Sequence, residues 1–239
     1  MRKICDIHMH VIPGIDDGSK SINESLEMLL ESVRQGVGAV IATPHSWAID
    51  ECGIDLVNKR FAELKQAASE VGIPVELLLG CEVLVSKDTI DECIRKLDDG
   101  TYPTMGISSS HVLTEFDPYW YDQAEAEYCV KRLVDAGYTP IIAHAERNGI
   151  STDEAMRLFK LGARIQVNLY SIADEPRKEI RETAHRLLGF GLVQYVGSDA
   201  HRMTHRPPVI ESGIKECRAL FSNWYTEEIS VWSAVCVLY

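Results

Sequence analysis

The feature that most constrains this chain is a regular alternation between short apolar runs and longer segments with helical periodicity. The apolar runs, bounded by Gly, Pro or Ser, predict seven strands at residues 4–10, 39–43, 75–80, 111–116, 139–143, 164–168 and 192–197. Apolar residues from 22 to 37 repeat with the period of an amphipathic helix, which Ser21 and Glu24 begin as a capping box and Gly36 ends. This alternation predicts parallel βαβ units, with a closed α/β barrel as the economical arrangement and one domain over residues 1–239.

Charge and hydropathy limit the partners of such a barrel. The 36 acidic and 24 basic side chains give a net charge of −12, which argues against nucleic-acid binding. No segment reaches the roughly 20 apolar residues that span a bilayer, so no membrane insertion is expected. The apolar tail at 229–239 is expected to pack against the fold. Seven scattered cysteines without a CxxC pair indicate reduced thiols and a cytoplasmic protein.

Potential metal ligands follow the predicted strands at the point where each one ends. In a β/α barrel the C-terminal strand ends form one rim, so residues far apart in sequence are expected to meet there. The candidates at strand ends are His8, His10, His45, Glu82, Glu115, His144, Asp199 and His201, and Asp17 is added from the loop after the first strand. Because side chains alternate along a strand, Asp6 is expected on the same face as His8 and His10.

Each histidine, taken alone, is as well explained by a structural role. Five of the eight histidines, however, lie at the ends of four predicted strands, together with three carboxylates. Buried imidazoles and carboxylates are costly unless a cation shares their pocket. Nitrogen and oxygen ligands without thiolate suit Mn²⁺, Fe²⁺ or Zn²⁺, and nine ligands exceed the coordination of one ion, which implies two or three.

Two arginines lie close to these ligand segments. Arg147 follows His144 by three residues, and Arg206 lies five residues after His201. A metal cluster activates water and screens phosphoryl oxygens, and guanidinium groups hold phosphate at two points. A surface salt bridge is the simpler role for either arginine alone, but their position beside ligand segments favours phosphate binding.

Competing phosphatase chemistries leave no trace in the chain. No cysteine is followed six residues later by arginine, and the sequence contains no GxxxxGK[ST] loop and no GxSxG elbow. Cys5 and Cys81 are expected on the strand face opposite His8 and Glu82, as packing residues rather than nucleophiles.

In order, these motifs resemble those of the polymerase-and-histidinol-phosphatase (PHP) superfamily. Within it, the chain is similar to the metal-dependent protein-tyrosine phosphatases of bacterial capsule and exopolysaccharide systems. The matching segments are Asp6-Ile7-His8-Met9-His10, Ile15-Asp16-Asp17-Gly18, Thr43-Pro44-His45, Gly80-Cys81-Glu82, Glu115-Phe116, Ala143-His144-Ala145-Glu146-Arg147, Ser198-Asp199-Ala200-His201 and Arg206-Pro207-Pro208. The segment after His45 and the C-terminal tail depart from the family pattern.

The resemblance implies a distorted (β/α)7 TIM-like barrel with three ions, usually Mn²⁺, and a tyrosine-phosphorylated bacterial kinase as partner. It gives the nine candidates ligand roles, favours Asp17 over its neighbour Asp16, and places Arg147 and Arg206 near the phosphate. The expected reaction is in-line attack of a metal-bridging hydroxide on phosphotyrosine. A phosphoesterase for histidinol phosphate or nucleotides, and a non-catalytic metal-holding module that docks the kinase, stay open as alternatives. A homo-oligomer is compatible with either.

Overall fold

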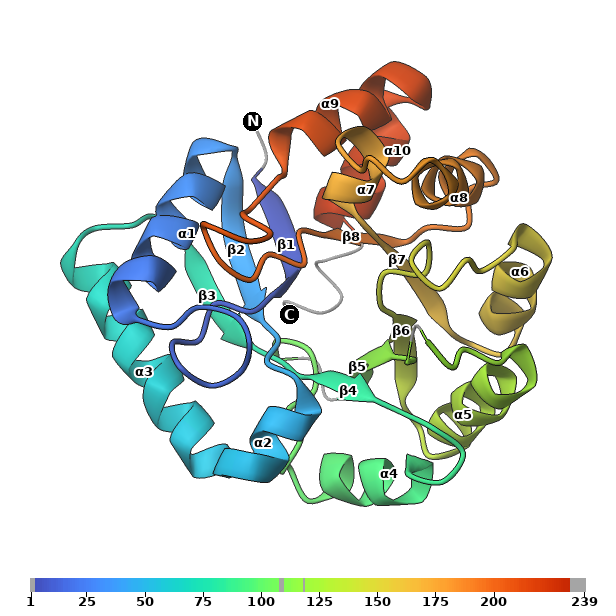
Figure 1. Cartoon of the computed structure of the whole chain (residues 1–239), viewed down its shortest axis with the longest axis horizontal. Helices are drawn as coiled ribbons and strands as arrows, with labels where there is room; N and C mark the ends of the chain where they lie inside the picture. Colours follow the sequence, from blue (N-terminus) through green and yellow to red (C-terminus); the bar gives the residue numbers. More distant parts are fainter. Residues whose placement is uncertain (1–2, 108–109, 118, 233–239) are drawn as a thin grey trace.

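The protein is an α/β fold in which helices surround a central ring of strands (Figure 1). The structure, a computed structural model, describes residues 3–107, 110–117 and 119–232. The strands are β1 Ile4–Met9, β2 Val37–Ala42, β3 Glu76–Leu79, β4 Glu82–Leu84, β5 His111–Glu115, β6 Thr139–Ile142, β7 Arg164–Asn168 and β8 Tyr195–Gly197. The helices are α1 Ile22–Arg34, α2 Ser46–Cys52, α3 Ile54–Glu70, α4 Ile90–Asp98, α5 Gln123–Asp135, α6 Thr152–Lys160, α7 Leu169–Ala173, α8 Lys178–Gly189, α9 Glu211–Leu220, α10 Asn223–Glu227 and the π-helical turn η1 Glu228–Trp232.

All strand pairs among the described residues are parallel, as the alternation predicts, and they form two sheets in the orders β1-β2-β3 and β4-β5-β6-β7-β8. Parallel bridges join the sheets on both sides, between Met9 and Ala200 and between His45 and Glu82. The strand expected at 75–80 is β3, and the chain passes through Gly80 into β4, which pairs with β5 instead of β2. The eight strands therefore occupy seven positions around a barrel-like ring, confirming the predicted fold class.

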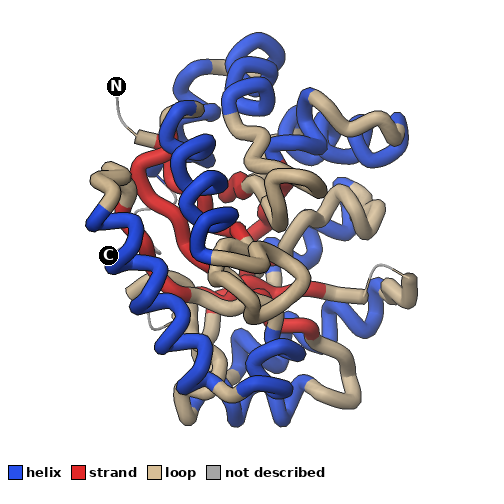
Figure 2. The backbone as a smooth tube through the Cα atoms, turned by 60° about the vertical axis from the view of Figure 1, so that its left-hand side comes forward, coloured by secondary structure: helices blue, strands red, loops and turns tan. Residues whose placement is uncertain are grey.

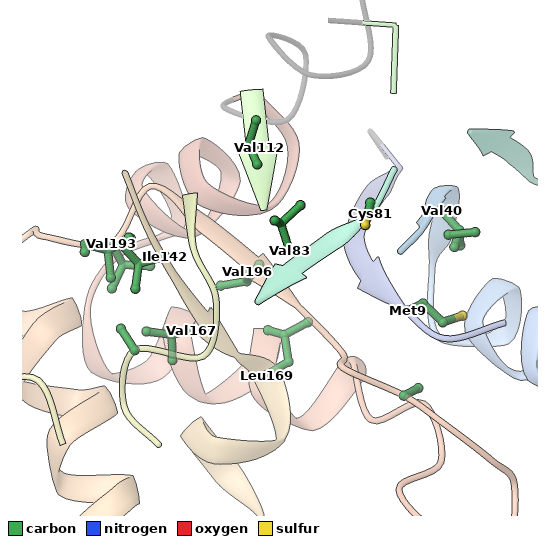
Figure 3. Packing of buried hydrophobic residues seen from close by; sticks show 14 of the residues in the cluster. Met9, Val40, Cys81, Val83, Val112, Ile142, Val167, Leu169, Val193 and Val196 are labelled. Carbon is green, nitrogen blue, oxygen red and sulfur yellow. The ribbon is translucent and has the colours of Figure 1, made fainter. Parts of the chain in front are cut away.

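Two apolar clusters hold the ring in place. The larger lies between the strands and the surrounding helices, and Figure 3 shows side chains that several successive strands supply to it. These include Met9 of β1, Val40 of β2, Val83 of β4, Val112 of β5, Ile142 of β6, Val167 of β7 and Val196 of β8. The smaller cluster takes residues from β1, β2, β5, β6 and β8, so it lies inside the ring. Figure 2 shows the same layering, with strands enclosed by helices.

The expected strand alternation fails on β1. The pairing of β1 with β2 shifts register between Asp6 and Met9, so side chains on either side of the shift no longer follow period two. Cys5 packs in the interior cluster and not on the opposite face from His8, although it is a packing residue as expected. Cys81 packs in the outer cluster, as predicted.

The clearest predicted helix is α1, which begins and ends close to the expected residues. Ser21 accepts a hydrogen bond from the backbone N–H of Glu24, as a capping box requires. The Glu24 carboxylate completes a variant of the box, because it accepts from the N–H of Lys20 and not of Ser21. Of the tail expected to pack, Ile229 is buried, and residues 233–239 lie outside the described residues. None of the helices in the described part of the chain has the length and apolar character that crossing a bilayer requires.

Candidate metal centre

Side chains from the C-terminal ends of the strands converge at one end of the ring. At the centre, His8 Nε2 and His10 Nε2 lie 3.2 Å apart, and Glu82 Oε2 lies 3.2 Å from each of them. All three side chains are fully buried. The first and fourth strands therefore bring two imidazoles and a carboxylate to a common point, as the positions of these residues at strand ends predict.

The protons on these imidazoles can be assigned from their partners. His10 Nδ1 lies 2.8 Å from Asp16 Oδ2, a carboxylate oxygen that can only accept, so Nδ1 carries the proton of the neutral ring. His10 Nε2 then presents a bare lone pair to His8 Nε2 and Glu82 Oε2. Three electron-rich atoms this close repel one another unless positive charge lies between them.

Protons or metal ions can supply that charge. Burial and His45 lower the pKa of His10, but Asp16 and Glu82 outweigh them and raise it to about 9. Burial likewise lowers the pKa of His45, while Glu82, Asp17 and Glu115 raise it to about 11. Several buried atoms also lack a hydrogen bond within the described chain: Glu82 Oε2, His45 Nδ1 and His144 Nδ1. This donor set of nitrogens and carboxylate oxygens fits divalent cations.

Three groups of ligand atoms lie close enough to hold ions. In each, the atoms are within 4.8 Å of one another; the groups are His8, His10 and Glu82; His10, Asp17, His45 and His201; and His45, Glu82 and Glu115. Asp17 Oδ1 lies 3.5 Å from His45 Nε2 and 3.4 Å from His201 Nε2. Shared members link the three groups into one cluster.

His144 and Asp199 complete the cluster outside these groups. His144 Nε2 lies 2.9 Å from Glu82 Oε1 and 3.6 Å from Glu115 Oε1. Asp199 Oδ1 lies 3.6 Å from His8 Nε2 and 3.7 Å from His10 Nε2. All nine predicted side chains therefore meet in one place.

Asp199 also forms the boundary between this cluster and a cavity. Its Oδ2 accepts hydrogen bonds from Arg147 Nη1 and Arg206 Nη1, both at 2.8 Å. Beyond the arginines lies a cavity of about 580 Å³, lined by both guanidinium groups and by Tyr170 and Pro207, among others. A ligand in this cavity would contact both arginines and would be separated from the cluster by the Asp199 carboxylate.

Backbone strain is concentrated at the same residues. Within the described chain, three residues other than glycine have positive φ: His144 at 32°, Asp199 at 53° and Arg206 at 55°. Such conformations are disfavoured by contact between Cβ and the backbone, and they persist where surrounding structure enforces them. His144 and Asp199 are candidate metal ligands, and Arg206 is a candidate phosphate-binding residue, so the three positive φ angles all belong to the candidate site.

The supporting roles of Asp6 and Asp16 beside the cluster were not predicted from the sequence. Asp6 does not share a face with His8 and His10; it is buried and accepts from the backbone N–H groups of His8 and Ser198, at 3.2 and 2.8 Å. Asp16 orients His10 and accepts the N–H of His45 at 3.2 Å, while its neighbour Asp17 faces the imidazoles. The sequence offered one signal for these roles: Asp6 is a polar residue inside a predicted strand, and Asp16 is the neighbour of the candidate ligand Asp17.

Comparison with known proteins agrees with the geometry. The chain is 32% identical over 213 residues to the putative tyrosine-protein phosphatase CapC of Staphylococcus aureus, covering 84% of this chain and 78% of that protein. It is 29% identical over 235 residues to the tyrosine-protein phosphatase CpsB of Streptococcus pneumoniae, covering 90% and 94%.

The fold is shared with solved structures. A structure from a study of YwqE from Bacillus subtilis and CpsB from Streptococcus pneumoniae, described as unique metal-dependent tyrosine phosphatases, superposes with a TM-score of 0.83 at 24% identity, covering 98% of this chain and 94% of that one. A phosphotriesterase homology protein from Escherichia coli, with phosphate in its active site, gives 0.65 at 12% identity, covering 100% and 98%. The family model for capsular polysaccharide synthesis, CpsB/CapC, matches residues 4–239, and the chain therefore belongs to the CpsB/CapC family.

Proposed function

We propose that this chain is a metal-dependent phosphatase that hydrolyses phosphotyrosine in proteins. The main support for the proposal is the position of the nine-residue cluster beside a cavity of about 580 Å³. The Asp199 carboxylate lies between the two, and Arg147 and Arg206 hold it by hydrogen bonds. The relatives' names state the same activity for those proteins. The proposal assigns ligand roles to the nine residues and phosphate-binding roles to the two arginines.

The cluster would hold two or three divalent ions. His8, His10 and Glu82 offer one site, and the two groups that share His45 offer the others. Mn²⁺ is our first choice, with Fe²⁺ and Zn²⁺ as alternatives, because imidazole and carboxylate ligands accept all three. When bound, such ions lower the pKa of a coordinated water and offset the charge on phosphoryl oxygens.

The arginines prepare the site for the phosphate. Each donates one Nη1–H to Asp199 Oδ2, and their side chains are about one-third exposed, at 29% and 35%. Arg206 Nη2 also contacts His201 Nε2 at 2.5 Å. The other N–H groups of the two guanidinium groups can reach an anion that enters from the cavity. Guanidinium forks bind phosphate oxygens at two points, which fixes the orientation of the ester.

The cavity has room for the rest of the substrate. An apolar cavity of about 150 Å³ holds benzene. At about 580 Å³, this cavity takes a phenyl ring and neighbouring peptide atoms. Phenol has a pKa of about 10, so phenolate leaves without the strong general acid that an alkoxide needs.

The proposal extends to the partner and its location. With a net charge of −12, the protein has little bulk attraction for phosphorylated partners, so selection must occur by docking or in the cavity. A tyrosine-phosphorylated kinase of the capsule system is the substrate we propose. The six described cysteines are free thiols, which supports a cytoplasmic location.

The decisive experiment compares three substrates with metal-depleted and Mn²⁺-reloaded protein. We expect Mn²⁺-dependent hydrolysis of a phosphotyrosyl peptide, with far lower turnover of histidinol phosphate and single-stranded DNA. Preference for either of the latter would replace the proposal with a small-molecule or nucleotide phosphoesterase. Full activity after chelation would exclude the metal mechanism.

A second comparison tests the non-catalytic alternative. His10→Ala removes a central ligand, and the proposal expects phosphatase activity to disappear while kinase binding, measured separately, persists. Unchanged activity in this variant would show that the hydrolysis does not depend on this cluster. Wild-type protein that binds metal and the kinase but hydrolyses no phosphotyrosine would favour the non-catalytic docking module.

A further inference from the structure

Two buried side-chain amides lie on β7, a strand that supplies none of the nine proposed ligands. Gln166 is fully buried and Asn168 is 5% exposed, and their positions two residues apart place both on the interior face. Buried amides are costly unless their hydrogen-bonding groups are satisfied. Here the partners are the metal cluster's own residues.

The amides form a continuous chain of hydrogen bonds. Gln166 Oε1 accepts the backbone N–H of His144 at 2.8 Å, and Gln166 Nε2 donates to Asn168 Oδ1 at 2.8 Å. Asn168 Nδ2 then donates to Asp199 Oδ2 at 3.0 Å. We call this chain of bonds, from His144 through Gln166 and Asn168 to Asp199, the amide relay.

Both ends of the amide relay fix its direction. A backbone N–H can only donate, so Gln166 must present oxygen to His144. An ionised carboxylate can only accept, so Asn168 must present its NH₂ group to Asp199. In the central bond, Gln166 Nε2 donates to Asn168 Oδ1, which is consistent with both requirements. Each amide therefore has one possible orientation.

That orientation determines which nitrogen of His8 is protonated. His8 Nδ1 lies 3.4 Å from Gln166 Oε1, an oxygen already fixed as an acceptor. The neutral His8 ring therefore carries its proton on Nδ1 and leaves Nε2 bare, toward His10 and Glu82. Gly197 provides the space, because a Cβ there would lie 2.7 Å from His8 Cβ and 3.4 Å from Gln166 Nε2.

The other end of the relay orients Asp199. Its Oδ2 is held by Asn168 and by the two arginines, so its Oδ1 remains for the cluster. When a phosphate takes up the arginine donors, the Asn168 bond would still hold the carboxylate in place.

We infer that Gln166 and Asn168 are positioning residues for the metal centre: the amide relay sets the tautomer of His8 and the orientation of Asp199, and so raises metal affinity. The inference rests on the ligand roles of the proposed function. Partners of this kind, which orient ligands through a hydrogen bond, change metal affinity by roughly 10–100-fold when mutated.

The test measures Mn²⁺ binding to metal-depleted protein by calorimetry. Gln166→Met keeps the length of the side chain and removes both of its hydrogen-bonding groups. We expect its Kd for Mn²⁺ to rise by about 10–100-fold. Excess Mn²⁺ should restore most of the kcat, because all nine ligands are intact.

Gln194→Met is the matched control. Gln194 Oε1 accepts the N–H of Ile165 at 3.0 Å, at the opposite end of β7 from the cluster, so this variant loses a hydrogen bond to the same strand. Its Kd for Mn²⁺ should equal that of the wild type. If Gln166→Met does not fold, Asn168→Ala tests the relay from the Asp199 end and should also weaken Mn²⁺ binding.

The possible results distinguish failure of the amide relay from failure of the proposed function. Equal Mn²⁺ affinity in Gln166→Met or Asn168→Ala and the wild type would overturn the relay, whatever the activity. Wild-type protein that binds Mn²⁺ but does not hydrolyse phosphotyrosine would overturn the proposed function and leave the relay standing. Wild-type protein that binds none of Mn²⁺, Fe²⁺ and Zn²⁺ would overturn both.

Discussion

Arg206 has a backbone conformation that suits glycine better than arginine, and this gives a quantitative prediction. Its φ is +55°, while its Nη1 donates to Asp199 at 2.8 Å. We compare Arg206→Ala with Arg206→Gly. Both variants lose the guanidinium and its contacts with Asp199 and His201, so those contributions cancel in the comparison. The remaining difference is the backbone preference of alanine against glycine.

The expected size follows from two opposing effects. A residue with a Cβ costs about 1–2 kcal/mol in the left-handed region, and glycine avoids this cost. Glycine also makes the unfolded chain more flexible, which destabilises the fold by about 0.4–1 kcal/mol relative to alanine. The net advantage of glycine is therefore about 1 kcal/mol. For a chain of this length, that corresponds to a Tm roughly 2–4 °C higher.

The assay is calorimetric unfolding in chelator, so that metal binding does not contribute to Tm, together with kcat/KM for a phosphotyrosyl peptide with Mn²⁺. Both variants should lose about 10²-fold or more in kcat/KM, because a charged donor to the phosphate is missing. Arg202 lies in the same loop, pairs with Glu24 at 3.1 Å and has no positive φ. In Arg202 variants the order should reverse, with alanine more stable than glycine and activity retained.

Two results would refute this reasoning. If Arg206→Ala unfolds at the same temperature as Arg206→Gly, or at a higher one, the positive φ carries no cost and the strain argument fails. If either variant keeps wild-type kcat/KM, Arg206 does not hold the phosphate.

Three further predictions concern the cluster and its surroundings. Burial raises the pKa of the Cys5 and Cys81 thiols well above their usual value, so iodoacetamide should leave phosphatase activity intact; inactivation traced to either residue by mass spectrometry would contradict the metal mechanism. Gly197→Ala places a methyl group 2.7 Å from His8 Cβ, and calorimetry should find Mn²⁺ binding weakened by about 10-fold or more, whereas unchanged binding would show that His8 has room to move. Asp16→Asn weakens the acceptor for His10 Nδ1, so the Mn²⁺ concentration for half-maximal activity should rise by about 10–100-fold; an unchanged titration would assign Asp16 a purely structural role.

Much of the fold was accessible from local patterns. The seven predicted strands correspond to strands of the structure, and the helix predicted from residue 22 is α1 with Ser21 at its N-cap. This helix ends at Arg34, and Val37, which was predicted to continue the helical pattern, begins β2 instead. The break of the third strand into β3 and β4 was missed. Gly80 lies at this break, where a Cβ would lie 3.0 Å from both Ile41 and Met105, and these contacts join segments that are distant in sequence.

The sequence by itself determined the composition of the site. Ligand type and position at a strand end are local properties, so eight of the nine residues, all except the loop residue Asp17, and the need for positive charge among them could be read from the chain. The assignment of Asp17 over Asp16 came from spacing and family resemblance, and the structure places Asp17 facing the imidazoles and Asp16 behind His10.

Only the tertiary structure decided how these atoms are oriented. The register shift on β1 breaks the alternation that would place Asp6 beside His8 and His10. Asp199, which has a positive φ, presents one oxygen to the cluster and the other to the arginines. Gln166 of the relay also contacts His8, which lies 158 positions before it in the sequence. The sequence pattern records which groups a strand carries, whereas hydrogen-bond direction and backbone strain arise from long-range contacts that exist only after the ring has closed.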